Sequence, residues 1–160
     1  MFEFFKKNNE KCLVAVQTGK VISIKEVPDE VFSEKILGDG VAIIPSEDDV
    51  VSPVDGEVIQ VSETGHAFCI RSEDKMDVLI HIGVDTVNLK GEGFESFVSA
   101  GQKIRAGDLI GKANIKLIEE RGYPTHTAIL ITNMGELKDM KTIFGSAQKG
   151  KTKIVSYIKK

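Results

Sequence analysis

The sequence is poor in cysteine and contains no long apolar segment. Cys12 and Cys69 are its only two cysteines, and no CxxC spacing is present. Neither a disulfide framework nor a CxxC-type structural zinc site is therefore predicted. No apolar run approaches the roughly 20 residues that a membrane-spanning helix needs. We therefore expect a cytoplasmic protein.

A strong excess of charge of one sign is also lacking. The chain has 160 residues and a formal net charge of −3, which gives no electrostatic reason to expect nucleic-acid binding. A chain of this length forms a single domain with a sizeable buried core. We expect residues 1–11 to be a flexible N-terminal tail and residues 12–160 to be that domain.

The N-terminal segment carries no targeting signal that we recognise. Residues 1–7 are too short and too charged for a signal peptide. The alternative to a frayed tail is a short, weakly amphipathic helix that touches a membrane surface.

Motifs of several enzyme classes are missing as well. We find no GxSxG, HExxH or paired-carboxylate pattern. The glycine-rich segment 90–94 lacks the GxxxxGK[ST] spacing and does not lead from a strand into a helix. We therefore interpret it as a turn and not as a phosphate-binding loop.

The sequence does contain a series of short, β-branched segments separated by turn signals such as Asp39-Gly40 and Asp55-Gly56. This pattern predicts an all-β fold, an antiparallel β-sandwich or flattened barrel. Only residues 28–36 and 114–122 are expected to form short helical turns. The predicted strands are residues 14–16, 20–24, 40–44, 57–61, 67–70, 78–82, 109–113, 126–132 and 153–158.

A faint repeat suggests an internal duplication. Residues 19–24 and 56–61 share the pattern glycine, charged residue, Val-Ile, polar residue, aliphatic residue. Each is followed by a segment that ends in a phenylalanine, Phe32 or Phe68. Two similar β-units are one explanation. The other is that any turn followed by a strand looks like this.

His81 is the first candidate for chemistry. It shares a strand face with Leu79, and Gly83 leaves room for another group to approach the backbone. Asp85 can orient the ring or attract a basic partner, and backbone N–H groups near Gly83 can bind an anion. A half-buried histidine that bonds only to the backbone is the structural alternative.

His66 makes a functional interpretation stronger. Thr64 lies two residues earlier, so its hydroxyl can reach an imidazole nitrogen from the same strand face. A strand–turn–strand arrangement can then place His66 beside His81. Two neutral imidazoles at one place can hold a phosphoryl group or a metal ion. His126 has no acidic neighbour in sequence, and we interpret it as structural.

At these residues the chain resembles the glucose-type enzyme IIA of the bacterial phosphoenolpyruvate-dependent sugar phosphotransferase system. The run HxGxDTVxLxGxGF, which starts at His81, and the spacing of the two histidines carry most of the resemblance. It extends over nearly the whole chain, from about Cys12 onward. The matching segments are residues 28–43, 52–56, 64–68, 81–87, 89–94, 101–103 and 131–134.

The resemblance implies a compact antiparallel β-sandwich that needs no cofactor. It further implies that His81 accepts a phosphoryl group from the phosphocarrier HPr and passes it to a cysteine of an enzyme IIB domain. His66 is then its partner, and Thr64 is hydrogen-bonded to that partner. The implied partner-binding residues are Asp29, Phe32, Gly83 and Asp85.

Further partners follow from the same resemblance. Regulatory target proteins that respond to the phosphorylation state are implied, and a Zn²⁺ ion held by His66 and His81 can bridge to such a partner. Because no IIB or IIC segment is recognised, we expect a stand-alone IIA unit that meets the membrane only through a permease. The sequence departs from the family at Ser62, where a bulky apolar residue is common, so the apolar rim is expected to differ there.

Two other protein classes match parts of the sequence. Lysostaphin-type zinc peptidases share an HxGxD-like string with residues 81–85, but their HxH strand and a third ligand are not evident. A lipoyl- or biotinyl-like carrier requires a modified lysine. Lys75 is the only candidate, and it lacks the flanking methionine on its N-terminal side.

Overall fold

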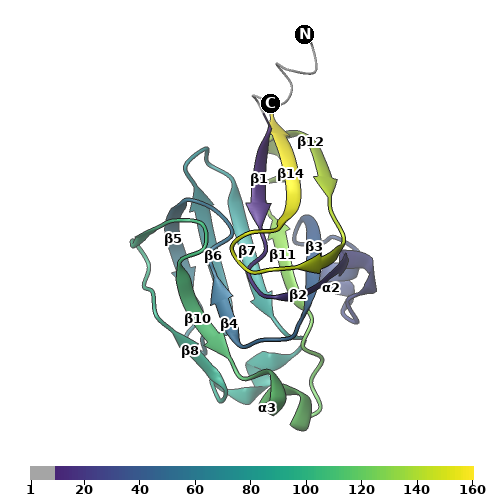
Figure 1. Ribbon diagram of the computed structural model, residues 1–160, viewed down its shortest axis with the longest axis vertical. Helices are drawn as coiled ribbons and strands as arrows, with labels where there is room; N and C mark the ends of the chain where they lie inside the picture. Colours follow the sequence, from purple (N-terminus) through teal and green to yellow (C-terminus); the bar gives the residue numbers. More distant parts are fainter. Residues whose placement is uncertain (1–9) are drawn as a thin grey trace.

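The computed structural model describes residues 10–160, which form almost entirely antiparallel β-structure (Figure 1). The expectations for residues 1–9, a flexible tail or a membrane-touching helix, lie outside the described residues. Lys11 already belongs to the first strand, β1 (Lys11–Val14). No helix within residues 10–160 is long and apolar enough to cross a bilayer.

Three sheets share one core. The large sheet has eight strands in the order β13-β2-β3-β11-β7-β6-β5-β9, and the two small sheets have the orders β1-β14-β12 and β4-β10-β8. In Figure 1 the strands β4, β10 and β8 lie in front of β5, β6 and β7, and β1, β14 and β12 lie above them. The remaining bounds are β2 Gly19–Ser23, β3 Asp39–Pro45, β4 Asp49–Val51, β5 Gly56–Val61, β6 Ala67–Ser72, β7 Asp77–Ile82, β8 Phe94–Ser96, β9 Lys103–Ile104, β10 Leu109–Ala113, β11 Thr127–Ile131, β12 Leu137–Thr142, β13 Gly145–Ala147 and β14 Lys153–Lys159.

The two-residue alternation of the strands separates an inner face from an outer face of the large sheet. Phe68, Ile70 and Ile80 are fully buried on the inner face, in the main core with residues of both small sheets. The outer face carries a second, smaller cluster, which we call the outer cluster. Its members are Ile22, Ile24, Val27, Phe32, Ala42, Val84, Ala128 and Leu130.

The chain between β2 and β3 covers part of the outer cluster. It forms the 3₁₀ turn η1 (Ile24–Glu26) and the helix α2 (Glu30–Ser33). Ser23 and Glu26 form a capping box at η1, and the Asp29 side chain caps α2 by accepting the Val31 N–H at 3.0 Å. These caps fix a very short helix, which buries Phe32 against the outer face.

The predicted all-β sandwich with short helical turns is confirmed. It is not a closed barrel, because β13 and β9 are open edges of the large sheet. Both predicted helical segments contain a helix, α2 and α3 (Ile115–Glu120). The predicted strand at residues 14–16 is wrong, since β1 ends at Val14. Five further strands were not predicted, and most of them are too short to show a two-residue pattern: β4, β8, β9, β12 and β13.

The repeated segments form β2 and β5, and each is the second strand from an edge of the large sheet. Gly19 and Gly56 each allow a close approach to the neighbouring strand. A Cβ on either one would lie 2.1 Å from a carbonyl oxygen of the next strand, at Ile44 or Arg71. The phenylalanines differ, because Phe32 is in the outer cluster and Phe68 is in the main core. Internal duplication therefore stays a prediction, and it concerns the strands alone.

Candidate functional site

His81 lies on the outer face of the large sheet, in β7 between β6 and β11. Its cross-strand neighbours are Ala67 on one side and Ala128 on the other. Because both neighbours are alanines, the imidazole is flanked by low side chains and remains partly accessible. Leu79 shares this face, as the sequence predicts. The ring therefore lies partly exposed on a mostly apolar part of this face.

A backbone carbonyl fixes the tautomer of His81. Its Nδ1 lies 2.9 Å from the Gly83 carbonyl oxygen. A carbonyl can only accept, so Nδ1 carries the proton and Nε2 has a lone pair. The same peptide group donates its Val84 N–H to the Pro124 carbonyl at 3.1 Å. The two bonds polarise one another in the same direction, which strengthens the hold on the ring.

Only glycine fits at position 83. Gly83 has a φ of 78°, and a Cβ there would lie 2.3 Å from Thr86 Cγ2 and 3.1 Å from the Pro124 carbonyl oxygen. Thr86 is itself buried, with its hydroxyl donating to the Ile82 carbonyl at 2.5 Å. A side chain at Gly83 would therefore displace the carbonyl that orients His81.

Two expectations about this loop need correction. The group that orients the His81 ring is the Gly83 carbonyl, and not Asp85. The Gly83 N–H does not face a bound anion either, because it donates to the His126 carbonyl at 3.0 Å. His126 thus supports the site through its backbone. Its own Nδ1 is buried with no hydrogen-bond partner among the described residues.

His66 reaches the site from a turn and not from a strand, since β6 begins only at Ala67. Its carbonyl accepts the Ile82 N–H at 2.8 Å, which ties it to the strand that carries His81. The two imidazole centroids lie 5.0 Å apart, with the rings almost perpendicular. The predicted pairing of the histidines is therefore present, although a turn brings it about.

Two hydroxyls approach His66 Nδ1. Thr64 Oγ1 lies 2.5 Å from this nitrogen, in agreement with the contact expected from the sequence. Ser62 Oγ lies 3.3 Å from it, a contact that the sequence analysis missed. The Phe94 ring also packs against His66, with centroids 6.2 Å apart. In the sequence, Phe94 was marked only as the last residue of the glycine-rich segment and of the HxGxDTVxLxGxGF run.

Burial keeps both imidazoles neutral. Desolvation lowers the pKa of His66 below its ordinary value, and the neighbouring His81 lowers it further. Desolvation also lowers the pKa of His81, and this outweighs the opposite effects of the Gly83 carbonyl, Asp29 and Asp85. At neutral pH the site therefore presents an uncharged His81 Nε2 with its lone pair available.

The rim around His81 combines an aromatic ring with carboxylates. The Phe32 and His81 centroids lie 5.0 Å apart. The charges of Asp29 and Asp85 act to raise the pKa of His81, so both carboxylates influence the ring. Large apolar side chains in the same segments are exposed: Val31, Ile36, Leu37 and Val87. An apolar rim with acidic groups suits a partner protein that carries basic residues.

The described residues offer little for a metal ion. No group of three or more His, Cys, Asp and Glu side chains within residues 10–160 is arranged to hold one. His66 and His81 supply two imidazole nitrogens, whereas a stable zinc site uses four ligands. Any zinc site here needs ligands from a second molecule.

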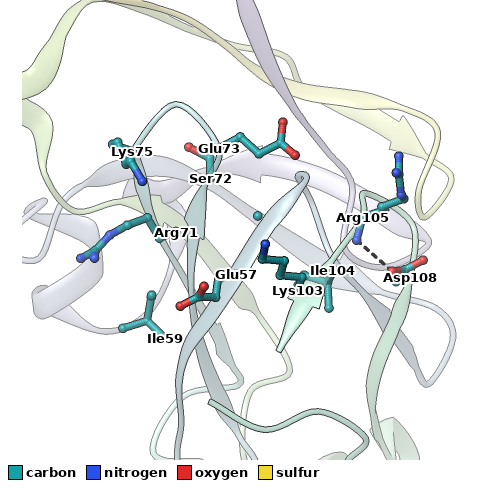
Figure 2. Close-up of a pocket in the computed structure, with 11 residues that line it drawn as sticks. Glu57, Ile59, Arg71, Ser72, Glu73, Lys75, Lys103, Ile104, Arg105 and Asp108 are labelled. Atoms are coloured by element: carbon teal, nitrogen blue, oxygen red, sulfur yellow. Dashed lines mark hydrogen bonds between the residues drawn. The ribbon is translucent and has the colours of Figure 1, made fainter. Parts of the chain in front are cut away.

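A separate hollow of about 590 Å³ lies near the β5, β6 and β9 strands (Figure 2). Its lining mixes both signs of charge, and none of the histidines lines it. Arg71 is already paired with Asp77 at 2.8 Å, and the Arg105 backbone N–H donates to Asp108 at 2.8 Å. The hollow therefore selects no particular ligand charge. The histidine pair lies elsewhere on the molecule.

Comparisons with known proteins bear on this site. A family model described as "phosphoenolpyruvate-dependent sugar phosphotransferase system, EIIA 1" matches residues 11–137. A Bacillus cereus protein named PTS system glucose-specific EIIA component is 46% identical over 97% of this chain and 94% of its own. A Bacillus subtilis PTS system glucosamine-specific EIICBA component is 40% identical over 86% of this chain and 22% of its own. The structure of glucose permease IIA from Mycoplasma capricolum has a TM-score of 0.85 and 36% identity, over 93% of this chain and 97% of that one.

The lowered histidine pKa values predict how stability changes with pH. Burial lowers the pKa of His66, His81 and His126 in the folded state, so the unfolded chain binds more protons below about pH 6.5. The free energy of unfolding should therefore be greatest above pH 6.5 and fall as the pH drops through that value. Urea unfolding at pH 7.5, 6.5 and 5.5 measures it.

The His81→Gln variant is the matched comparison, and it should lose less stability over the same interval. NMR titration of the ring protons checks each histidine separately, and each midpoint should lie below 6.5. A midpoint above 6.5 for His81 would mean that Asp29 and Asp85 outweigh burial.

Proposed function

Because the chain belongs to the EIIA 1 family of the phosphoenolpyruvate-dependent sugar phosphotransferase system, we propose that His81 carries the phosphoryl group that the protein transfers during sugar uptake. The donor is phospho-HPr, and the acceptor is a cysteine of an enzyme IIB domain. The observation that supports this assignment best is the hydrogen bond from His81 Nδ1 to the Gly83 carbonyl, which leaves Nε2 as the nucleophile.

The reaction consists of two displacements at phosphorus. In the first, the lone pair of His81 Nε2 forms an N–P bond while the N–P bond of the donor histidine breaks, and its electron pair returns to the donor ring. In the second, a cysteine thiolate of the acceptor forms an S–P bond, and the electron pair returns to His81 Nε2. Such transfers need alignment, exclusion of water and stabilisation of the equatorial oxygens.

We assign these tasks to the surroundings of His81. The Gly83 carbonyl holds the ring in line, and the apolar surroundings, with Phe32 and Leu79, exclude water when a partner docks. His66 donates from Nε2 to a phosphoryl oxygen when the Thr64 hydroxyl donates to its Nδ1. Asp29 and Asp85 repel a bare phosphoryl anion, and so we expect them to pair with basic residues of the partner.

The partners are proposed on similar grounds. The Bacillus subtilis relative is named as an EIICBA component, which supports a IIB domain of a permease as the acceptor. The relatives are named for glucose and glucosamine, so a hexose is the substrate class that we propose for the permease. Regulatory targets that bind only the unphosphorylated form would use the same rim.

The first prediction from this proposal is that His81→Gln abolishes labelling from ³²P-phosphoenolpyruvate in the presence of the general phosphotransferase proteins. The amide has no nucleophilic nitrogen, although it can still bond to the Gly83 carbonyl and preserve the fold. The matched control is His126→Gln, which should label fully because its ring lies outside the pair. Stoichiometric, acid-labile phosphate on His81→Gln would contradict the assignment.

A second prediction separates acceptance of the phosphoryl group from its delivery. His66→Gln should still accept phosphate, because the His81 lone pair is unchanged. Transfer to the IIB domain should slow by about 10² or more, since one donor to a developing charge is worth about 2.7–4 kcal/mol. Rapid-quench measurement of both half-reactions tests this, and an equal loss in both would argue against the proposed roles.

A third prediction concerns zinc. His66 and His81 can supply two ligands, and a partner that offers Glu or Asp can complete the tetrahedron with water. We expect no tight site in the isolated protein, a zinc-strengthened complex with such a partner, and loss of that complex when His81 is phosphorylated. Calorimetry with and without Zn²⁺ measures this. Submicromolar zinc affinity in the protein alone that survives His66→Ala would place the ligands elsewhere.

A further inference from the structure

Ser62 occupies an unusual position in the turn before His66. Its N–H donates to the Ala67 carbonyl at 3.0 Å, and its carbonyl accepts the Gly65 N–H at 3.0 Å. The Ala67 N–H therefore finds no carbonyl across the turn, and it donates to Ser62 Oγ at 3.1 Å. The side chain replaces a backbone acceptor, and this fixes the position of its oxygen.

The same oxygen lies 3.3 Å from His66 Nδ1. A hydroxyl has one proton and two lone pairs, and one lone pair of Ser62 is already engaged by the Ala67 N–H. Among the described residues, His66 Nδ1 is the partner left for the Ser62 proton. Thr64 Oγ1 approaches the same nitrogen at 2.5 Å. Two hydroxyl protons can both point at Nδ1 only when that nitrogen carries none.

We propose that Ser62 is a positioning residue which, with Thr64, holds neutral His66 in the tautomer that has its proton on Nε2. In this form the nitrogen away from the hydroxyls is a hydrogen-bond donor. In the other tautomer that nitrogen would present a lone pair to the phosphoryl oxygens on His81 and repel them. The inference about the tautomer rests on the turn geometry, and its consequence for transfer rests on the proposed function.

The main test reads the tautomer directly. The ¹⁵N shifts of the imidazole nitrogens, recorded at pH 8 in uniformly labelled protein, distinguish a protonated from an unprotonated Nδ1. In the unaltered protein the Nε2–H form of His66 should dominate. In Ser62→Ala the ratio of Nε2–H to Nδ1–H forms should fall about fivefold, which is the weight of one ordinary hydrogen bond. Ser62→Thr, which keeps the hydroxyl, should restore the ratio.

Ser72→Ala is the matched control. The Ser72 hydroxyl also accepts a backbone N–H across a turn, from Met76 at 2.8 Å, but it contacts Asp74 and no histidine. Losing it weakens a turn of the same kind, and the His66 tautomer ratio should not change. An equal shift in Ser62→Ala and Ser72→Ala would reduce Ser62 to a structural role and overturn the inference.

Function supplies a second measurement. Ser62→Ala should slow delivery to the IIB domain about fivefold and leave acceptance from HPr unchanged. A dominant Nδ1–H form in the unaltered protein overturns the inference even if Ser62→Ala does not fold. An unchanged ratio in a folded Ser62→Ala overturns it as well. If the ratio shifts as expected but the unaltered protein never takes up phosphate, the proposed function fails while the role of Ser62 in the tautomer stands.

Discussion

The site depends on one hydrogen bond, from His81 Nδ1 to the Gly83 carbonyl. This bond determines which nitrogen of His81 carries the proton. Its acceptor lies only two residues further along the same chain. The bond exists because the backbone turns sharply at Gly83, where Thr86 and the Pro124 carbonyl leave no space for a side chain. Pro124 also holds the same peptide group from its other side through the Val84 N–H. The segment that follows α3 therefore helps to orient His81, through the carbonyl of Pro124.

Burial and charge act against each other at this histidine, and burial prevails. Ala67 and Ala128 flank His81 and leave its ring partly exposed, while Phe32 packs against it. Asp29 and Asp85 favour a charged imidazole, yet the pKa of His81 remains below its ordinary value. A protonated ring would have no lone pair on Nε2. The apolar surroundings therefore preserve the lone pair on Nε2 as well as the fold.

The sequence predicted the parts of this protein that follow from local patterns. β7 has a clear apolar alternation around His81, and Asp29 is a strong helix cap, so the strand and α2 were both foreseen. β9 has only two residues and β13 contains a glycine, so neither shows a pattern that could be read. The pairing of His66 with His81 was expected from an assumed strand, but a turn produces it. The Ser62 contact and the Pro124 support depend on the path of the backbone, which residue types alone do not specify.

The two histidines differ in the kind of group that holds them. His81 faces a carbonyl, which can only accept, so its proton position is fixed by chemistry alone. His66 faces hydroxyls, which can donate or accept, so its proton position depends on how those hydroxyls are themselves engaged. In the proposed function, this fixed lone pair on His81 Nε2 is the nucleophile. In the proposed function, the tautomer that Ser62 and Thr64 hold lets His66 donate from Nε2 to a phosphoryl oxygen. The difference between a carbonyl and hydroxyls thus favours opposite tautomers of the two imidazoles, and the proposed function assigns them separate roles on that basis.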